Sequence, residues 1–122
     1  MIAAMSEHGI TLDVPALTGT WQNTNAASQG VTRLDIAGDG NDLRISAHAG
    51  QSWGSVNGHA YSVDGFDCRE ALAFNCLFDL GDRDVRLQAN IKAGVLVIVF
   101  LTRFHDARTN LFTREFYYRS AQ

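Results

Sequence analysis

The sequence predicts an all-β protein, an eight-stranded antiparallel up-and-down (meander) barrel. Three observations support this fold class. Clusters of Gly, Asp and Asn recur at short spacing, the segments between them alternate apolar and polar residues, and none of these segments carries an apolar stripe at helical spacing. The 122 residues leave room for one domain, which we place at residues 17–122 after an N-terminal leader of residues 1–16.

Eight strands are expected, each bounded by turn-forming residues. They cover residues 17–23, 31–37, 43–49, 53–63, 71–80, 85–92, 95–105 and 111–119. Pro15, the single proline, precedes the first of them. A chain of this length buries roughly two thirds of its unfolded surface, so the domain needs neither disulfides nor a structural metal to fold.

Two hairpins have a register that can be predicted from alternation. Folding about Gly81 and Asp82 collects apolar side chains on one face, namely Phe74, Cys76, Phe78, Val85, Leu87, Ala89 and Ile91. Folding about Asp39 and Gly40 does the same for Leu34, Ile36, Leu43, Ile45 and Ala47. The second register also places Asp35 opposite Arg44 as a cross-strand ion pair.

The last two strands depart from this alternation. The segment at 96–101 is apolar on both faces, and the strand at 111–119 adds Phe112, Phe116, Tyr117 and Tyr118. A strand that is apolar on both sides needs a second cover. We expect a homo-oligomer through these two strands, and the alternative is that the N-terminal leader folds over the same patch.

Composition and charge exclude several classes of protein. Hydrophobic residues make up 46% and charged residues 19%, as in an ordinary globular domain, and the net charge of −3 disfavours nucleic-acid binding. The N-terminus lacks a basic segment followed by an apolar core, and the longest apolar run is too short to span a membrane. Cys68 and Cys76 have no metal-binding or disulfide pattern, so we expect a cytoplasmic protein with reduced thiols and no membrane partner.

The two ends of the domain carry a resemblance. The first strand begins Leu17-Thr18-Gly19-Thr20-Trp21, and the last ends Tyr117-Tyr118-Arg119. This pattern resembles the calycin superfamily of lipocalins, fatty-acid-binding proteins and avidins, in which a Gly-x-Trp opens the first strand and a terminal basic residue packs over the indole. The resemblance implies that Trp21 and Arg119 close one end of a lipocalin/avidin-like barrel. Biotin binding is not implied, because the later ligand-holding tryptophans of avidins have no counterparts.

The strand at 53–63 contains the first group of candidate site residues. Small residues such as Gly54 and Gly58 leave space, and an eight-stranded barrel has room for one small ligand. In one interpretation Trp53, His59 and Tyr61 lie on the solvated outside of the barrel. In the other, a bulge at Gly58 turns them toward the barrel mouth, where Trp53 would bind a ligand.

The last two strands contain the second group. Arg103, Arg114 and Glu115 interrupt otherwise apolar segments that include Phe100 and Phe116. A charge in such surroundings is either paired or meets a ligand. The two interpretations are an Arg–Glu ion pair in the barrel wall or at an interface, and an anion-recognising or acid–base group at the floor of a pocket.

These residues lead to three functional hypotheses. The first is a barrel that binds a small apolar or aromatic molecule through Trp53, Arg103, Arg114, Phe100 and Phe116. The second is a cofactor-free isomerase, cyclase or dehydratase of small-molecule biosynthesis, with Glu115, His59 and Tyr61 transferring protons. The third is a structural or interaction module that uses the apolar face of the last two strands. No cofactor is expected, and zinc is disfavoured because His48 and His59 lack a third ligand.

Overall fold

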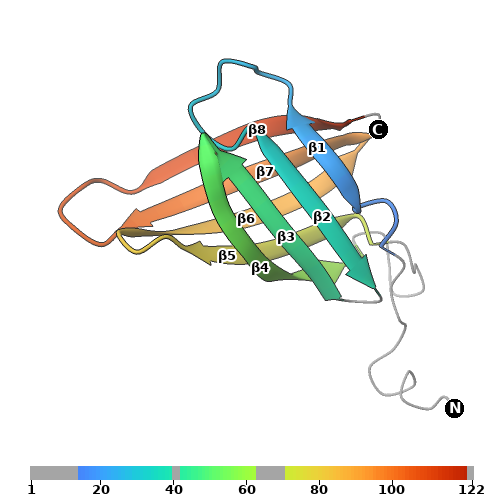
Figure 1. Cartoon of the computed structure of the whole chain (residues 1–122), viewed down its shortest axis with the longest axis horizontal. Helices are drawn as coiled ribbons and strands as arrows, with labels where there is room; N and C mark the ends of the chain where they lie inside the picture. Colours follow the sequence, from blue (N-terminus) through green and yellow to red (C-terminus); the bar gives the residue numbers. More distant parts are fainter. Residues whose placement is uncertain (1–13, 40–41, 63–70, 121–122) are drawn as a thin grey trace, which may run out of the picture.

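The computed structural model describes residues 14–39, 42–62 and 71–120 of the chain. Eight antiparallel strands follow one another in meander order and close into a barrel, which confirms the predicted fold class (Figure 1). Their bounds are β1 Gly19–Asn23, β2 Arg33–Asp39, β3 Asp42–Ala49, β4 Gln51–Tyr61, β5 Ala73–Asp79, β6 Arg83–Lys92, β7 Val95–Phe104 and β8 Leu111–Arg119. Within the described residues, no helix is long and apolar enough to cross a membrane.

The observed register confirms one predicted hairpin and corrects the other. In β5–β6, Asp79 pairs with Asp84, as expected for a turn at Gly81 and Asp82. In β2–β3, Asp35 pairs with Ser46 instead of Arg44, so the predicted ion pair is wrong. The turn lies one residue later than expected, which shifts every partner by two positions. Because side chains alternate with a period of two, the apolar residues keep their face despite the shift.

The core fills the barrel from the inward faces of all eight strands. Its largest fully buried side chains include Trp21, Tyr117, Phe74 and Phe78. Cys76 is buried among them, and burial raises the pKa of its thiol to about 12. Cys76 is therefore the buried small hydrophobe that the alternation predicts, whereas Cys68 lies outside the described residues.

One end of the barrel is closed by the contact that the ends of the chain predicted. Trp21 and Arg119 are partners in the β1–β8 pair, and the guanidinium carbon of Arg119 lies 4.8 Å from the centre of the Trp21 ring. Arg119 also donates hydrogen bonds to the carbonyls of Thr18 and Ala16. The Trp21 indole donates to the carbonyl of Leu17 at 2.9 Å, and Leu17 is fully buried. The prediction of Trp21–Arg119 closure is confirmed.

The leader is described only from residue 14. Val14 and Leu17 are both buried in the core. The rest of the predicted leader, residues 1–13, lies outside the described residues, and the division of the chain at residue 16 stays a prediction.

The outer wall at β7 and β8 is as apolar as the sequence indicated. Phe112 is 69% exposed and Tyr118 51% exposed, with Phe116 and Leu111 also open to solvent. Next to them an outer groove of about 460 Å³ runs between Leu77 on β5, Leu101 on β7 and Phe112. The homo-oligomer expected through these strands stays a prediction.

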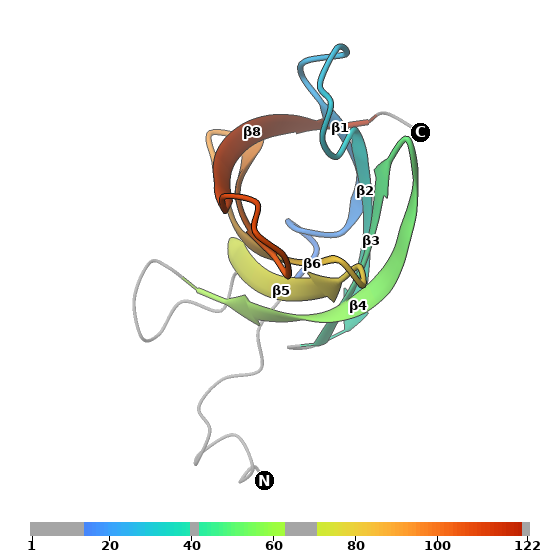
Figure 2. The ribbon, with the colours of Figure 1, turned by 90° about the vertical axis from the view of Figure 1, so that its left-hand side faces the viewer.

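The four connections β1–β2, β3–β4, β5–β6 and β7–β8 gather at the end of the barrel opposite the Trp21–Arg119 closure. This end points to the left in Figure 1 and toward the viewer in Figure 2, where the strands form a ring around its mouth. We refer to it as the open end, and to the end containing Trp21 and Arg119 as the closed end.

Candidate ligand-binding pocket

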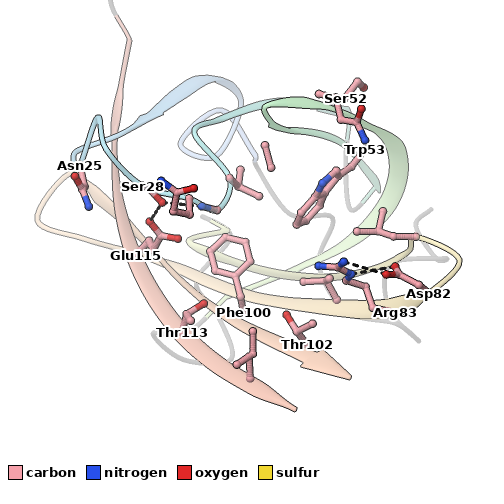
Figure 3. A pocket seen from close by; sticks show the side chains of 18 of the residues that line it. Asn25, Ser28, Ser52, Trp53, Asp82, Arg83, Phe100, Thr102, Thr113 and Glu115 are labelled. Carbon is pink, nitrogen blue, oxygen red and sulfur yellow. Dashed lines mark hydrogen bonds and ion pairs between the residues drawn. The ribbon is translucent and has the colours of Figure 1, made fainter. Parts of the chain in front are cut away.

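A pocket of about 1040 Å³ opens at the open end of the barrel (Figure 3). Its wall mixes apolar and polar side chains from the β1–β2 loop, from the β5–β6 turn and from strands β3, β4, β6, β7 and β8. The lining residues are Asn25, Ala27, Ser28, Gln29, Gly30, Val31, Ala49, Gln51, Ser52, Trp53, Leu80, Asp82, Arg83, Val85, Phe100, Thr102, Leu111, Thr113 and Glu115.

Trp53 reaches this pocket because of a β-bulge. The register between β3 and β4 shifts between Ser46 and His48, so that Ala47 faces both Trp53 and Gly54. Gly54 has a φ of +84°, a conformation that glycine adopts without steric cost. The extra residue turns the Trp53 side chain inward, where its ring meets Phe78 edge to face at 5.5 Å.

The bulge does not lie at Gly58, where the second interpretation of this strand placed it. Gly58 is a regular β4 residue paired with Leu43. A Cβ atom there would lie 2.2 Å from Cδ1 of Ile45, so the space that the glycine leaves is filled by the isoleucine. The small residue at this position serves core packing, and the pocket lies nearer the open end.

Glu115 lies on the other side of the pocket. Alternation along β8 turns it inward, between the buried Tyr117 and Thr113, and its backbone pairs with Ile98. Its Oε1 accepts hydrogen bonds from Asn23 Nδ2 and Ser28 Oγ, both at 2.6 Å. The side chain is half-buried, and Figure 3 shows it beside Ser28 with Phe100 between it and Trp53.

The loop between β1 and β2 is shaped around this carboxylate. Gly30 donates its backbone N–H to Ser28 Oγ at 3.0 Å, which orients the hydroxyl group toward Glu115. A Cβ atom on Gly30 would lie 2.7 Å from Glu115 Oε2, so the glycine allows the carboxylate to come close to the loop.

The buried Tyr117 holds the end of this loop, because its hydroxyl donates a hydrogen bond to the carbonyl of Val31 at 2.7 Å. Burial raises the pKa of Tyr117, and the charge of Glu115 raises it further. Tyr117 is therefore a neutral hydrogen-bond donor at ordinary pH.

The opposite rim is formed by a compensated network of charges. Asp82 accepts two hydrogen bonds from Arg83 at 3.0 Å and one from Arg108 at 3.2 Å. Arg108 also pairs with Asp106 at 2.8 Å. The hydrogen bond from Arg83, with a further contribution from Arg108, lowers the pKa of Asp82 to about 2. The aromatic ring of Phe104 lies under both guanidinium groups.

The structure brings together three of the residues that the sequence analysis singled out, Trp53, Phe100 and Glu115. His59 and Tyr61 lie instead on the exposed surface of β4, where their rings stack at 6.5 Å. These two side chains therefore have the position that the first interpretation, the solvated outside of the barrel, predicts.

The remaining three candidates also face outward. Arg103 pairs with Asp84 at 2.7 Å in the outer groove, and Arg114 lies 5.9 Å from the centre of the exposed Phe116 ring. Neither arginine forms an ion pair with Glu115 in the described part of the chain, so the wall of a single barrel does not contain the Arg–Glu pair, and such a pair at an interface stays a prediction.

Sequence reasoning missed the partners of Glu115. Asn23 ends β1 and Ser28 lies in the polar stretch that follows it, and such stretches are typical of turns without any further role. Alternation counted back from Tyr117 would have turned Glu115 inward and Arg114 outward, but nothing local indicates which loop covers it.

No group of three or more His, Cys, Asp or Glu side chains in residues 14–39, 42–62 and 71–120 could hold a metal ion. His48 lies next to Asp35 and Arg33, away from His59. The expectation that the chain uses no metal or cofactor stays a prediction.

The fold and the pocket together define a class: an eight-stranded meander barrel, closed at one end by a cation over an indole and open at the other. Comparisons with protein-family models, with curated proteins and with solved structures found no match to this chain.

Proposed function

We propose that this protein binds a small, partly apolar or aromatic molecule in the pocket at the open end of its barrel. The observation that carries the proposal is a pocket of about 1040 Å³ with Trp53 and Phe100 in its wall. Small-molecule sites are typically concave and lined by aromatic and aliphatic side chains with a few polar groups among them.

The balance of residues in the wall supports a ligand with both apolar and polar parts. Val31, Val85 and Phe100 provide apolar surface deep in the pocket, and each is buried. Polar side chains such as Glu115, Thr113 and Thr102 lie on the β7–β8 side of the same space. A ligand would gain affinity from apolar contact and orientation from hydrogen bonds.

A neutral fluorescent probe, N-phenyl-naphthylamine, tests the proposal directly. Its emission rises when it enters an apolar site, and we expect saturable binding of one probe per barrel. Trp53→Ala should weaken this binding, whereas Tyr61→Ala, an exposed aromatic on the outer surface of the same strand, should leave it unchanged. Absence of saturable binding would contradict the proposal. Loss of binding in Phe112→Ser but not in Trp53→Ala would show that the probe binds outside this pocket.

A second candidate function is acid–base catalysis in the same pocket, and Glu115 is the observation that favours it. A half-buried carboxylate facing a pocket can transfer a proton to or from a bound molecule. His59 and Tyr61 lie on the outer surface and do not support this role. A substrate should then copurify with Glu115→Gln, which binds it without converting it. The wild type should convert the same molecule to a product.

We also propose kinship with the calycins and a cytoplasmic location. The meander order and the Trp21–Arg119 contact support the kinship with the calycins.

The free, buried thiol of Cys76 supports the cytoplasmic location. Mass spectrometry of the intact protein isolated from cells should find both cysteines in the thiol form.

A further inference from the structure

The charges around the pocket are not evenly balanced. On the rim formed by the β5–β6 turn and the β7–β8 loop, two carboxylates face two guanidinium groups: Asp82 and Asp106 against Arg83 and Arg108. These four charges cancel. Glu115, on the other side of the mouth, lies outside this network.

Glu115 has only neutral partners within the described residues. Asn23 and Ser28 both donate to the same oxygen, Oε1, and neither carries a charge. Its neighbour Arg114 faces the outside of the barrel and lies over the Phe116 ring. The pocket therefore carries an uncompensated negative charge at a fixed position.

Partial burial removes water from a carboxylate, and hydrogen bonds from neutral donors offset only part of the free-energy cost of that loss. A cationic N–H group on a ligand would supply both the missing charge and the missing hydrogen bond, in the geometry that makes charged hydrogen bonds strong. Phe100 lines the same pocket as Glu115, and aromatic faces attract cations. An anionic ligand would instead meet repulsion from the same carboxylate.

We propose that the pocket selects molecules that join an aromatic or apolar body to a protonated amine, with the amine at Glu115 and the body against Phe100 and Trp53. This inference rests on the proposed binding function and adds the chemical class of the ligand.

Three probes of matched shape test the inference: naphthylmethylamine, naphthylmethanol and naphthylacetate. They share an aromatic body and differ in carrying a positive, neutral or negative head group. Isothermal titration calorimetry with the full chain should show the amine binding at least about tenfold more tightly than the alcohol, the size expected for a hydrogen bond to a charged group. The carboxylate should bind most weakly.

Glu115→Gln should remove this ranking. Glutamine keeps an oxygen that accepts from Asn23 and Ser28, so the loop retains its contacts while the charge is lost. We expect the amine to weaken to the affinity of the alcohol. Asp42→Asn, which removes the same charge from an exposed position at the other end of β3, should keep the ranking.

The two proposals fail in different ways. If none of the three probes binds, the pocket is not a binding site and the proposed function falls with the inference. If the alcohol or the carboxylate binds wild type as tightly as the amine, the function stands and the amine preference is wrong. The wild-type ranking decides this even where Glu115→Gln does not fold.

Discussion

The two ends of the barrel use the same kinds of residue for different purposes. Each has an inward-facing tryptophan, Trp21 at the closed end and Trp53 at the open end, and each has an arginine over an aromatic ring. At the closed end the indole is fully buried, and its ring NH bonds to a backbone carbonyl. At the open end the indole is half-buried and borders a pocket.

The difference lies in what surrounds these residues. Leu17 and Val14 are buried at the closed end, and Arg119 donates hydrogen bonds to the Thr18 and Ala16 carbonyls. At the open end the β1–β2 loop bonds to short side chains, Asn23 and Ser28, and a pocket of about 1040 Å³ lies beside it. Packing at one end stabilises the barrel, and incomplete packing at the other leaves space for a ligand.

The largest expected effect contrasts the two tryptophans. Trp21→Ala should lower the free energy of unfolding by about 3–5 kcal/mol, the usual cost of removing a fully buried aromatic side chain. Trp53→Ala should cost about 1–2 kcal/mol, because a partly exposed ring loses less apolar contact. Urea unfolding followed by circular dichroism measures both. Equal losses would contradict the division between a fully packed end and an end that borders a pocket. Trp21→Phe provides a graded variant where the alanine variant does not fold.

The two arginines give the next comparison. Arg119→Ala should cost about 1–3 kcal/mol, because the cation over the indole and the hydrogen bonds to the Thr18 and Ala16 carbonyls are lost together. Arg108→Ala at the open end should change stability by no more than the error of the measurement, since its ion pairs are exposed to solvent. Thermal unfolding of the two variants tests the difference, and an Arg108 effect as large as that of Arg119 would contradict it.

A third experiment asks whether the outer wall is covered by a second copy of the chain. If it is, Phe112→Ser should weaken self-association in sedimentation velocity measured over a range of concentrations. The stability of the barrel should change by less than about 0.5 kcal/mol, because the ring is mostly exposed. Tyr61→Ser on β4 is the matched control and should leave association unchanged. A wild-type chain that stays monomeric at every concentration would remove the predicted homo-oligomer.

The smallest effect concerns pH at the open end. Hydrogen bonds to the Gly81 carbonyl and the Asp84 carboxylate raise the pKa of His105 above its usual 6.5. Since the folded-state pKa is the higher one, the contribution of His105 to stability is complete below pH 6.5 and is lost as the pH rises through the raised value. An NMR titration of the His105 ring should have its midpoint above 6.5, and Asp84→Asn should lower that midpoint. A midpoint at or below 6.5 in the wild type would contradict the contact.

Several parts of the fold could be predicted because they depend on local pattern. The β5–β6 hairpin follows from Gly81 and from strict alternation on both sides of it, and the structure has that register. In the β2–β3 hairpin, the predicted partner of each residue was wrong by two positions. Each residue still lies on the predicted face of the sheet, because side chains alternate with a period of two. The Trp21–Arg119 closure followed from a resemblance carried by the two ends of the chain.

The site was harder to predict because its contacts cross the whole chain. Glu115 meets Ser28 and Asn23 over separations of 87 and 92 residues, which no local pattern encodes. The bulge that turns Trp53 inward could be expected somewhere in a glycine-rich strand. The structure has it at Trp53 and Gly54, opposite Ala47, and not at Gly58, where one of the two interpretations placed it.

The sequence by itself determined the number and order of the strands and the faces of the two hairpins β2–β3 and β5–β6, because alternation and turn residues act over a few positions. The contact between Trp21 and Arg119 was implied by the resemblance that the two ends of the chain carry. Only the tertiary structure decided that the opposite end of the barrel stays open, that Ile45 fills the space at Gly58 while a pocket remains beside Trp53, and that Glu115 has no cationic partner among the described residues. These outcomes depend on which side chains meet across the barrel, and that is settled only when all eight strands are in place.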